Sequence, residues 1–222
     1  MPIIKCKAKI IHIAHIPKCG GTSIIEYISS LDSNIAVCFN DDTYFSRPSE
    51  RKWSITSPQH IDGNSLSRLF PAEFIDEFLA VVRNPICRLK SAFTYQKFVE
   101  GNINYKTSID QFIKEELIFR YLDLGWMDNH FLPQVLLLYP GVSYSLFKIE
   151  SNGLNNMKDC LDYIFFGKNS DKSLPHSNKS ETNIPISHLP ATTKLSDESV
   201  ELVYQLYQAD YHSFNYKYPE QE

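Results

Sequence analysis

The stretch that decides the fold is residues 10–28, which read IIHIAHIPKCGGTSIIEYI. Its first part is a short apolar run typical of a buried strand, and its last part has the apolar spacing of a helix. The glycine pair Gly20-Gly21 between them lets the backbone turn sharply and approach a ligand, because no side chain intervenes. The sequence therefore predicts a strand from Ile10 to His15, a tight turn, and a helix from Ser23 to about Leu31.

This turn has the chemistry of an anion-binding loop. A helix N-terminus presents unpaired N–H groups and the positive end of the helix dipole, and Lys18 adds a full positive charge beside it. The order differs from the common nucleotide-triphosphate loop, in which the lysine follows the last glycine. A simpler interpretation stays open, because Ser23 and Glu26 have the spacing of a capping box, which needs no ligand.

A second strand-to-helix junction carries another basic residue. Residues 78–82 read FLAVV, a continuous apolar run that predicts a strand covered on both faces. Arg83 follows this strand directly, and Asn84 and Pro85 are suited to the N-cap and the first position of a helix. Arg83 is therefore expected at the carboxyl end of a strand, the edge at which open α/β sheets bind ligands.

Both junctions resemble segments of sulfotransferases that use 3′-phosphoadenylyl sulfate (PAPS) as donor. Residues 17–23, PKCGGTS, are similar to the family's 5′-phosphosulfate loop, with Cys19 where threonine is usual. Residues 82–93, VRNPICRLKSAF, are similar to its segment for the ribose 3′-phosphate, which distinguishes PAPS from ATP. The resemblance implies that the donor is bound by Lys18, Cys19, Gly20, Gly21, Thr22, Ser23, Arg83 and Ser91.

Three further segments extend the resemblance along the chain. They are residues 128–134 (DNHFLPQ), 178–180 (NKS) and 206–216. The nearest branch is that of the membrane-anchored carbohydrate sulfotransferases and their bacterial relatives, which implies a carbohydrate or other hydroxyl compound as acceptor. It also adds Lys179 and Ser180 to the nucleotide-binding residues, within a long polar loop at 167–193 that is expected to form a lid.

Transfer of a sulfuryl group to a hydroxyl calls for a base and for a positive charge on the leaving group. His60 is the candidate base, because an imidazole titrates near neutrality and its placement resembles that of the base in related carbohydrate sulfotransferases. Asp62 is the reserve carboxylate, and His130 is a candidate for lining the acceptor cleft. Lys18 is the second catalytic candidate, since its charge would neutralise the departing 3′,5′-bisphosphate. No metal is required.

Composition and patterning bound the architecture. The 222 residues are 43% hydrophobic and 22% charged, which suits one globular domain over residues 1–222. Alternating strands and helices predict an α/β fold with a central parallel sheet and helices on both faces, and the resemblance implies that this three-layer fold is P-loop-like. Further strands are expected at 35–39, 53–56 and 144–149, and further helices at 65–69, 108–120, 155–165 and 196–211.

Charge and hydropathy exclude some classes of partner. The net charge of −4 argues against a nucleic-acid-binding protein, and no stretch approaches the ~20 apolar residues of a membrane span. The first strand is expected to begin at about Lys9, which leaves no room for a signal segment, so a cytoplasmic location is expected if residue 1 is the natural start. The oligomeric state is not predicted.

The five cysteines have no spacing that indicates a zinc site or a disulfide framework. Cys19 lies beside Lys18 at a helix N-terminus, where a thiol pKa falls, so a role as nucleophile and a role as small loop residue both stay open for Cys19.

Two other functions of the protein also stay open. A P-loop-type nucleotide kinase would need ATP and Mg²⁺, against which the position of Lys18 speaks, and a non-catalytic nucleotide- or glycan-binding module would bind PAPS without turnover.

Overall fold

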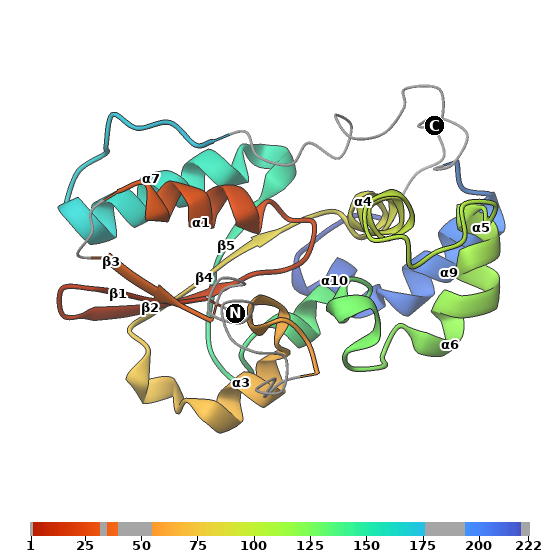
Figure 1. Ribbon diagram of the computed structural model, residues 1–222, viewed down its shortest axis with the longest axis horizontal. Coiled ribbons are helices and arrows are strands. Elements are labelled where there is room, and N and C mark those ends of the chain that lie inside the picture. Colours follow the sequence, from red (N-terminus) through yellow and green to blue (C-terminus); the bar gives the residue numbers. More distant parts are fainter. Residues whose placement is uncertain (1, 32–34, 40–54, 176–193, 219–222) are drawn as a thin grey trace.

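The computed structural model describes residues 2–31, 35–39, 55–175 and 194–218 of the chain. A five-stranded sheet lies at its centre, with the strand order β3-β1-β2-β4-β5 (Figure 1). The strands are β1 (Ile3–Cys6), β2 (Lys9–Ala14), β3 (Ile35–Cys38), β4 (Glu77–Val82) and β5 (Ser145–Lys148).

The pairing of the strands is mixed. β2 pairs in parallel with β4, which pairs in parallel with β5, so the predicted parallel sheet is confirmed for these strands. β1 was not predicted, and it pairs antiparallel with both β2 and β3. The two-residue turn between β1 and β2 has Lys7 at φ 54°, a conformation for which glycine or asparagine is the usual sequence signal.

Helices cover both faces of the sheet, which confirms the α/β layering. α1 (Gly21–Ser29) and α7 (Gly153–Phe166) lie side by side on one face, and α3 (Gly63–Leu69) lies on the other (Figure 1). Tyr27 of α1 donates a hydrogen bond to Asp162 of α7 at 2.5 Å. The same Asp162 accepts from the backbone N–H of Ser170, which anchors the segment after α7.

A second group of helices packs beside the sheet around its own apolar core (Figure 1). It contains α4 (Pro85–Phe98), α5 (Ile109–Phe112), a π-helical turn (Ile113–Leu117), α6 (Ile118–Arg120), α9 (Asp197–Leu206) and α10 (Gln208–Ser213). Asn84 caps α4 and Pro85 begins it, as predicted. The predicted closing helix is interrupted at Tyr207, whose hydroxyl donates to the carbonyl of Phe131 inside this core.

Two local predictions were wrong. Ile55 and Thr56 form a bend rather than the end of a strand, while residues 53 and 54 lie outside the described residues. The capping box is also absent, because α1 begins at Gly21 and its N-cap is Gly20 at φ 79°, with no side-chain hydrogen bond. A glycine in the left-handed region lets the helix begin before Ser23, which therefore lies inside its first turn.

The predicted lid falls mostly outside the structure. Residues 176–193, with Lys179 and Ser180, are outside the described residues. Within the described ranges, no helix is both long and apolar enough to span a bilayer.

Candidate active site

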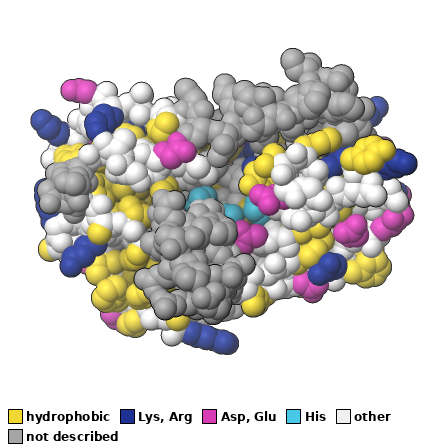
Figure 2. All heavy atoms as spheres, in the orientation of Figure 1, with side chains coloured by type: hydrophobic (Ala, Val, Ile, Leu, Met, Phe, Trp, Pro, Cys, Tyr) yellow, Lys and Arg dark blue, Asp and Glu magenta, His cyan; other side chains and the backbone are white. Residues whose placement is uncertain are grey.

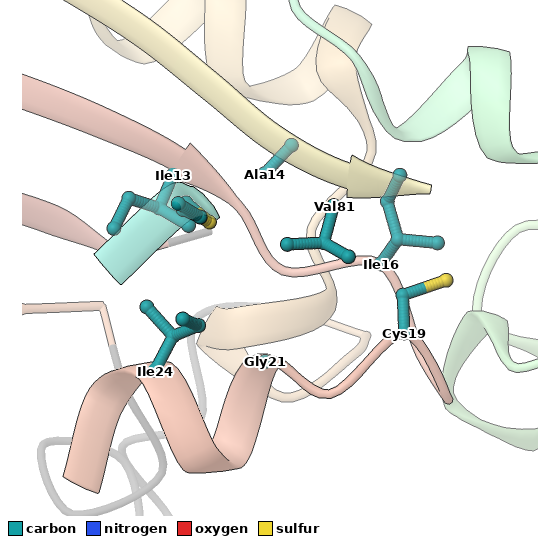
Figure 3. A pocket seen from close by; sticks show the side chains of 8 residues that line it. Ile13, Ala14, Ile16, Cys19, Gly21, Ile24 and Val81 are labelled. Atoms are coloured by element: carbon teal, nitrogen blue, oxygen red, sulfur yellow. The ribbon is translucent and has the colours of Figure 1, made fainter. Parts of the chain in front are cut away.

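The loop between β2 and α1 is closely packed and conformationally constrained. Figure 3 shows it running from Ile16 through Cys19 to Gly21 at the start of α1. Lys18 has φ 67° and Gly20 has φ 79°. A non-glycine residue in this region costs about 1–3 kcal/mol and is found mainly where function requires it. A Cβ on Gly21 would lie 2.2 Å from Cδ2 of His15, so no side chain fits there.

Lys18 points its ammonium group over an aromatic ring of α4. Its Nζ lies 3.9 Å from the ring centroid of Tyr95, a cation–π contact. Burial, together with the nearby charge of Arg83, lowers the pKa of Lys18 to about 8. A bound anion would raise the pKa of Lys18 again and favour its charged form, so the loop is suited to binding an anion.

Arg83 lies next to this loop at the carboxyl end of β4. Its Nη1 donates to the carbonyl of Lys18 at 3.3 Å, so the two predicted cationic residues meet. A guanidinium has five donors in a fork that matches phosphate, and this contact uses one of them. Ser91 lies two turns into α4 and is half-buried.

A buried glutamine joins the two strand-to-helix junctions. Gln134 accepts hydrogen bonds at Oε1 from the backbone N–H of Arg83 and from Sγ of Cys19, at 3.0 and 3.5 Å. Its Nε2 donates to the carbonyl of Arg83 and to Asp210 of α10. Gln134 was not among the predicted site residues, although it ends the 128–134 segment.

Cys19 is a packing residue rather than a nucleophile. Its side chain is 1% exposed, and burial raises the pKa of its thiol to about 12. The thiol therefore stays protonated near neutral pH and lacks the thiolate that attacks. The cavity that Cys19 lines with Ile13, Gly21 and Ile24 measures about 10 Å³, which is at the lower limit for one water (Figure 3).

His60 lies at the end of a 3₁₀ turn (Pro58–His60) and is linked to Lys18 through the rings of Tyr95 and His130. Tyr95 stacks on His130 with ring centroids 5.3 Å apart, and His130 meets His60 edge to face at 5.1 Å. A continuous row of side chains thus runs from Lys18 to His60. On the face drawn in Figure 2, histidine side chains reach the surface near the middle, beside acidic ones.

An aspartate holds the His60 ring. Nδ1 of His60 lies 2.6 Å from Oδ2 of Asp128. Ser57 donates to the same carboxylate from both its backbone N–H and its hydroxyl, at 2.6 and 2.7 Å. Burial alone would raise the pKa of Asp128, but the hydrogen bonds from His60 and Ser57 lower it to about 2. The carboxylate is therefore ionised and can only accept hydrogen bonds.

A strained turn presents Asp128 to His60. Met127, Asp128 and Asn129 have φ values of 45°, 54° and 60°, three successive non-glycine residues in the left-handed region. Asn129 donates from Nδ2 to the carbonyl of His60 at 2.8 Å. The fully buried Arg88 holds the chain that follows, since it donates to the carbonyls of His130 and Leu132. Such strain persists only where its surroundings over-determine it.

His15 is a further member of this cluster that the sequence did not indicate. Its ring centroid lies 5.3 Å from that of His60, and its Nδ1 has no hydrogen-bond partner among the described residues. Burial and then the neighbouring His60 hold the pKa of His15 well below its ordinary value. Burial lowers the pKa of His130 to about 3. His15 and His130 therefore stay neutral around His60.

The reserve carboxylate caps a helix. Asp62 is the N-cap of α3, and its Oδ1 accepts from the backbone N–H of Ser65 at 2.9 Å. It also lines a groove of about 340 Å³ together with Ile61 and Asn129, which follow His60 and Asp128 in the chain. The apolar lining is Ile55, Ile61, Leu69 and Leu124, and the polar lining is Thr56, Asp62, Ser65, Arg68 and Asn129.

The chain was compared with models of protein families. The model described as "Sulfotransferase family" matches residues 2–217, a span that includes both strand-to-helix junctions and the histidine cluster. No match was found among curated proteins or among solved structures.

Proposed function

Because the chain belongs to the sulfotransferase family and is therefore an enzyme of sulfuryl transfer, we propose that PAPS is its donor and a carbohydrate hydroxyl its acceptor. The observation that carries the proposal is the continuous row of side chains from Lys18 through Tyr95 and His130 to His60, which joins two chemically different groups. One end has the cationic loop with Lys18 and Arg83, and the other has His60 hydrogen-bonded to Asp128. These are an anion site and a base at opposite ends of one site.

The donor end would hold the 5′-phosphosulfate and the 3′-phosphate separately. Backbone N–H groups of residues 20–23 at the start of α1 would bind the 5′-phosphosulfate, with Lys18 beside them. The other donors of the Arg83 fork would bind the 3′-phosphate, with Ser91 as a second contact. Lys179 and Ser180 are proposed as further nucleotide contacts.

The transfer step follows from the two ends. The acceptor oxygen attacks the sulfur in line while Nε2 of His60 takes its proton. Asp128, ionised and able only to accept, requires the hydrogen on Nδ1 of His60 and so leaves a lone pair on Nε2. The bond from sulfur to the bridging oxygen breaks, and Lys18 stabilises the charge left on the 3′,5′-bisphosphate.

The groove lined by Ile61 and Asn129 has room for a carbohydrate of modest size. Its volume of about 340 Å³ lies in the range of small-ligand sites. Hydroxyl groups would meet Ser65 and Arg68, while Leu69 and Leu124 would pack against the C–H faces of the sugar ring.

The test is transfer of labelled sulfate from PAPS to a panel of sugars, lipids, peptides and small phenols. We expect labelled sugars with wild-type protein, much less label with Lys18→Ala, and a wild-type rate with His212→Ala, a matched change at an exposed histidine of α10. Label on lipids or peptides alone would contradict the carbohydrate acceptor. Phosphoryl transfer from ATP with Mg²⁺, and none from PAPS, would contradict the donor.

A further inference from the structure

The histidine cluster has the composition of a metal site. His60, Asp128 and His130 each offer one ligand atom, and these atoms lie within 4.8 Å of one another. We propose that this triad binds a divalent transition metal such as Zn²⁺ and that the bound metal inhibits the enzyme. The inhibition rests on the function of His60 proposed above, whereas metal binding does not depend on it.

The donor atoms select the class of metal. Two imidazole nitrogens and one carboxylate oxygen suit zinc and its neighbours, whereas magnesium and calcium prefer oxygen ligands alone. Three protein ligands leave a fourth position for water. Both imidazoles are buried, but the side chain of Asp128 is 33% exposed and provides access from solvent.

The surroundings orient the ligands before any metal binds. Nδ1 of His130 lies 2.8 Å from the carbonyl of Met127. A carbonyl only accepts, so this nitrogen carries the hydrogen and Nε2 has the free lone pair, an arrangement typical of metal-binding histidines. The two hydrogen bonds from Ser57 hold the Asp128 carboxylate, and Tyr95 stacked on His130 restricts that ring.

The ligand atoms must move before a metal fits, because they lie within 4.8 Å of one another and a pair at that limit must close by about 1.5 Å. Metal–ligand bonds of about 2.0–2.2 Å at tetrahedral angles separate ligand atoms by about 3.3 Å. Nδ1 of His60 and Oδ2 of Asp128 are 2.6 Å apart, so the pair must open by less than 1 Å to admit the metal. The partly exposed carboxylate can move by this amount more easily than the buried ring.

Binding would withdraw the base through a change of tautomer. In the free enzyme Nδ1 of His60 carries the hydrogen and Nε2 accepts the acceptor's proton. When Nδ1 binds the metal, the neutral imidazole carries its hydrogen on Nε2 instead. The Nδ1 proton leaves to solvent and Nε2 takes one up, so the charge of the ring is unchanged but Nε2 can no longer accept.

The binding experiment uses Co²⁺ as a coloured substitute for Zn²⁺. The full chain, treated with chelator and free of nucleotide, is titrated with Co²⁺ and then with Zn²⁺. We expect one Co²⁺ ion to bind per chain and to give a visible absorption band that Zn²⁺ removes. Binding of Co²⁺ should be at least about tenfold weaker in His130→Ala. His130→Gln, closer in size, is the second variant if His130→Ala does not fold, and His212→Ala is the matched control.

Sulfate transfer at increasing Zn²⁺ then tests the inhibition. Wild-type activity should fall with the midpoint measured for binding, and His130→Ala or His130→Gln, each compared with its own activity without metal, should need at least about tenfold more Zn²⁺. Absence of the Co²⁺ band, or equal binding by wild type and the His130 variants, would overturn the metal site. Saturating metal without loss of activity would leave the site standing and overturn the inhibition.

Discussion

The donor end and the base end of the proposed site are built in different ways. The donor end is built mainly from two short contiguous segments, residues 15–23 and 82–85, each at the junction of a strand and a helix. The base end is assembled from side chains on three segments, since Asp128 lies 68 residues from His60 and Tyr95 lies between them in sequence. Backbone geometry therefore defines the first end, and hydrogen bonds between distant side chains define the second.

This contrast predicts that damage to one end leaves the other working. His60→Ala should lower kcat by about 10²–10⁴-fold, because a general base is lost, and should leave nucleotide binding nearly intact. Turnover at saturating PAPS and the shift in melting temperature with adenosine 3′,5′-bisphosphate measure the two effects. His212→Ala is the control, and near-normal turnover of His60→Ala would make Asp62 the next residue to test.

A subtler change at the base end should act through His60. Asp128→Asn keeps a residue that tolerates the left-handed backbone, but its amide can present a donor to Nδ1 and favour the wrong tautomer of His60. We expect kcat to fall by about 100-fold with an altered pH profile and little change in donor KM.

Asp62→Asn is the matched control for this prediction. Asparagine caps helices as well as aspartate does, so α3 and the activity should both be preserved. The opposite order, with Asp62→Asn inactive and Asp128→Asn normal, would transfer the positioning role to Asp62.

At the donor end, Arg83 should decide which nucleotide binds. ATP has a free 3′-hydroxyl and cannot use a guanidinium fork placed for a 3′-phosphate. Adenosine 3′,5′-bisphosphate should therefore raise the melting temperature of the wild type, ATP at equal concentration should do little, and Arg83→Ala should erase the difference by losing about 10–100-fold in bisphosphate affinity. Equal stabilisation of the wild type by ATP would contradict the 3′-phosphate site.

The same contrast explains what the sequence could predict. The donor end was recognisable because its residues are contiguous and its strand, turn and helix each have a local signal. The predicted start of the helix differs from the observed one, because Gly20 in the left-handed region lets α1 begin two residues before the expected Ser23. β1 was missed for a similar reason, because its hairpin turn places Lys7 rather than glycine at positive φ.

The base end had no such local signal. His60 was identified as a base, but its pairing with Asp128 depends on three successive non-glycine residues, 127–129, in left-handed conformations, a run that local propensity does not predict. Gln134 contacts Arg83 across 51 residues of sequence, and a buried amide has no periodicity to mark it. Contacts of this kind follow from the packing of the two groups of helices, which spacing along the chain does not encode.

The smallest expected effect is a dependence of donor affinity on pH at Lys18. Its pKa of about 8 lies below the ordinary lysine value of 10.5, mainly because of burial, so in the free protein the ammonium loses its proton as pH rises through about 8. An anionic donor binds the charged form, and affinity for adenosine 3′,5′-bisphosphate should fall by up to about tenfold per pH unit between about pH 8 and 10. Between the same pH values the unfolded chain binds more protons at this residue than the folded one does. The Lys18 contribution to the free energy of unfolding without nucleotide should therefore rise with pH, opposite in sign to the binding effect.

Isothermal titration of the bisphosphate from pH 7 to 9.5, repeated with Lys18→Met, separates Lys18 from other groups. A slope that survives in Lys18→Met would assign the titration to another group and contradict the proposed contact between Lys18 and the donor.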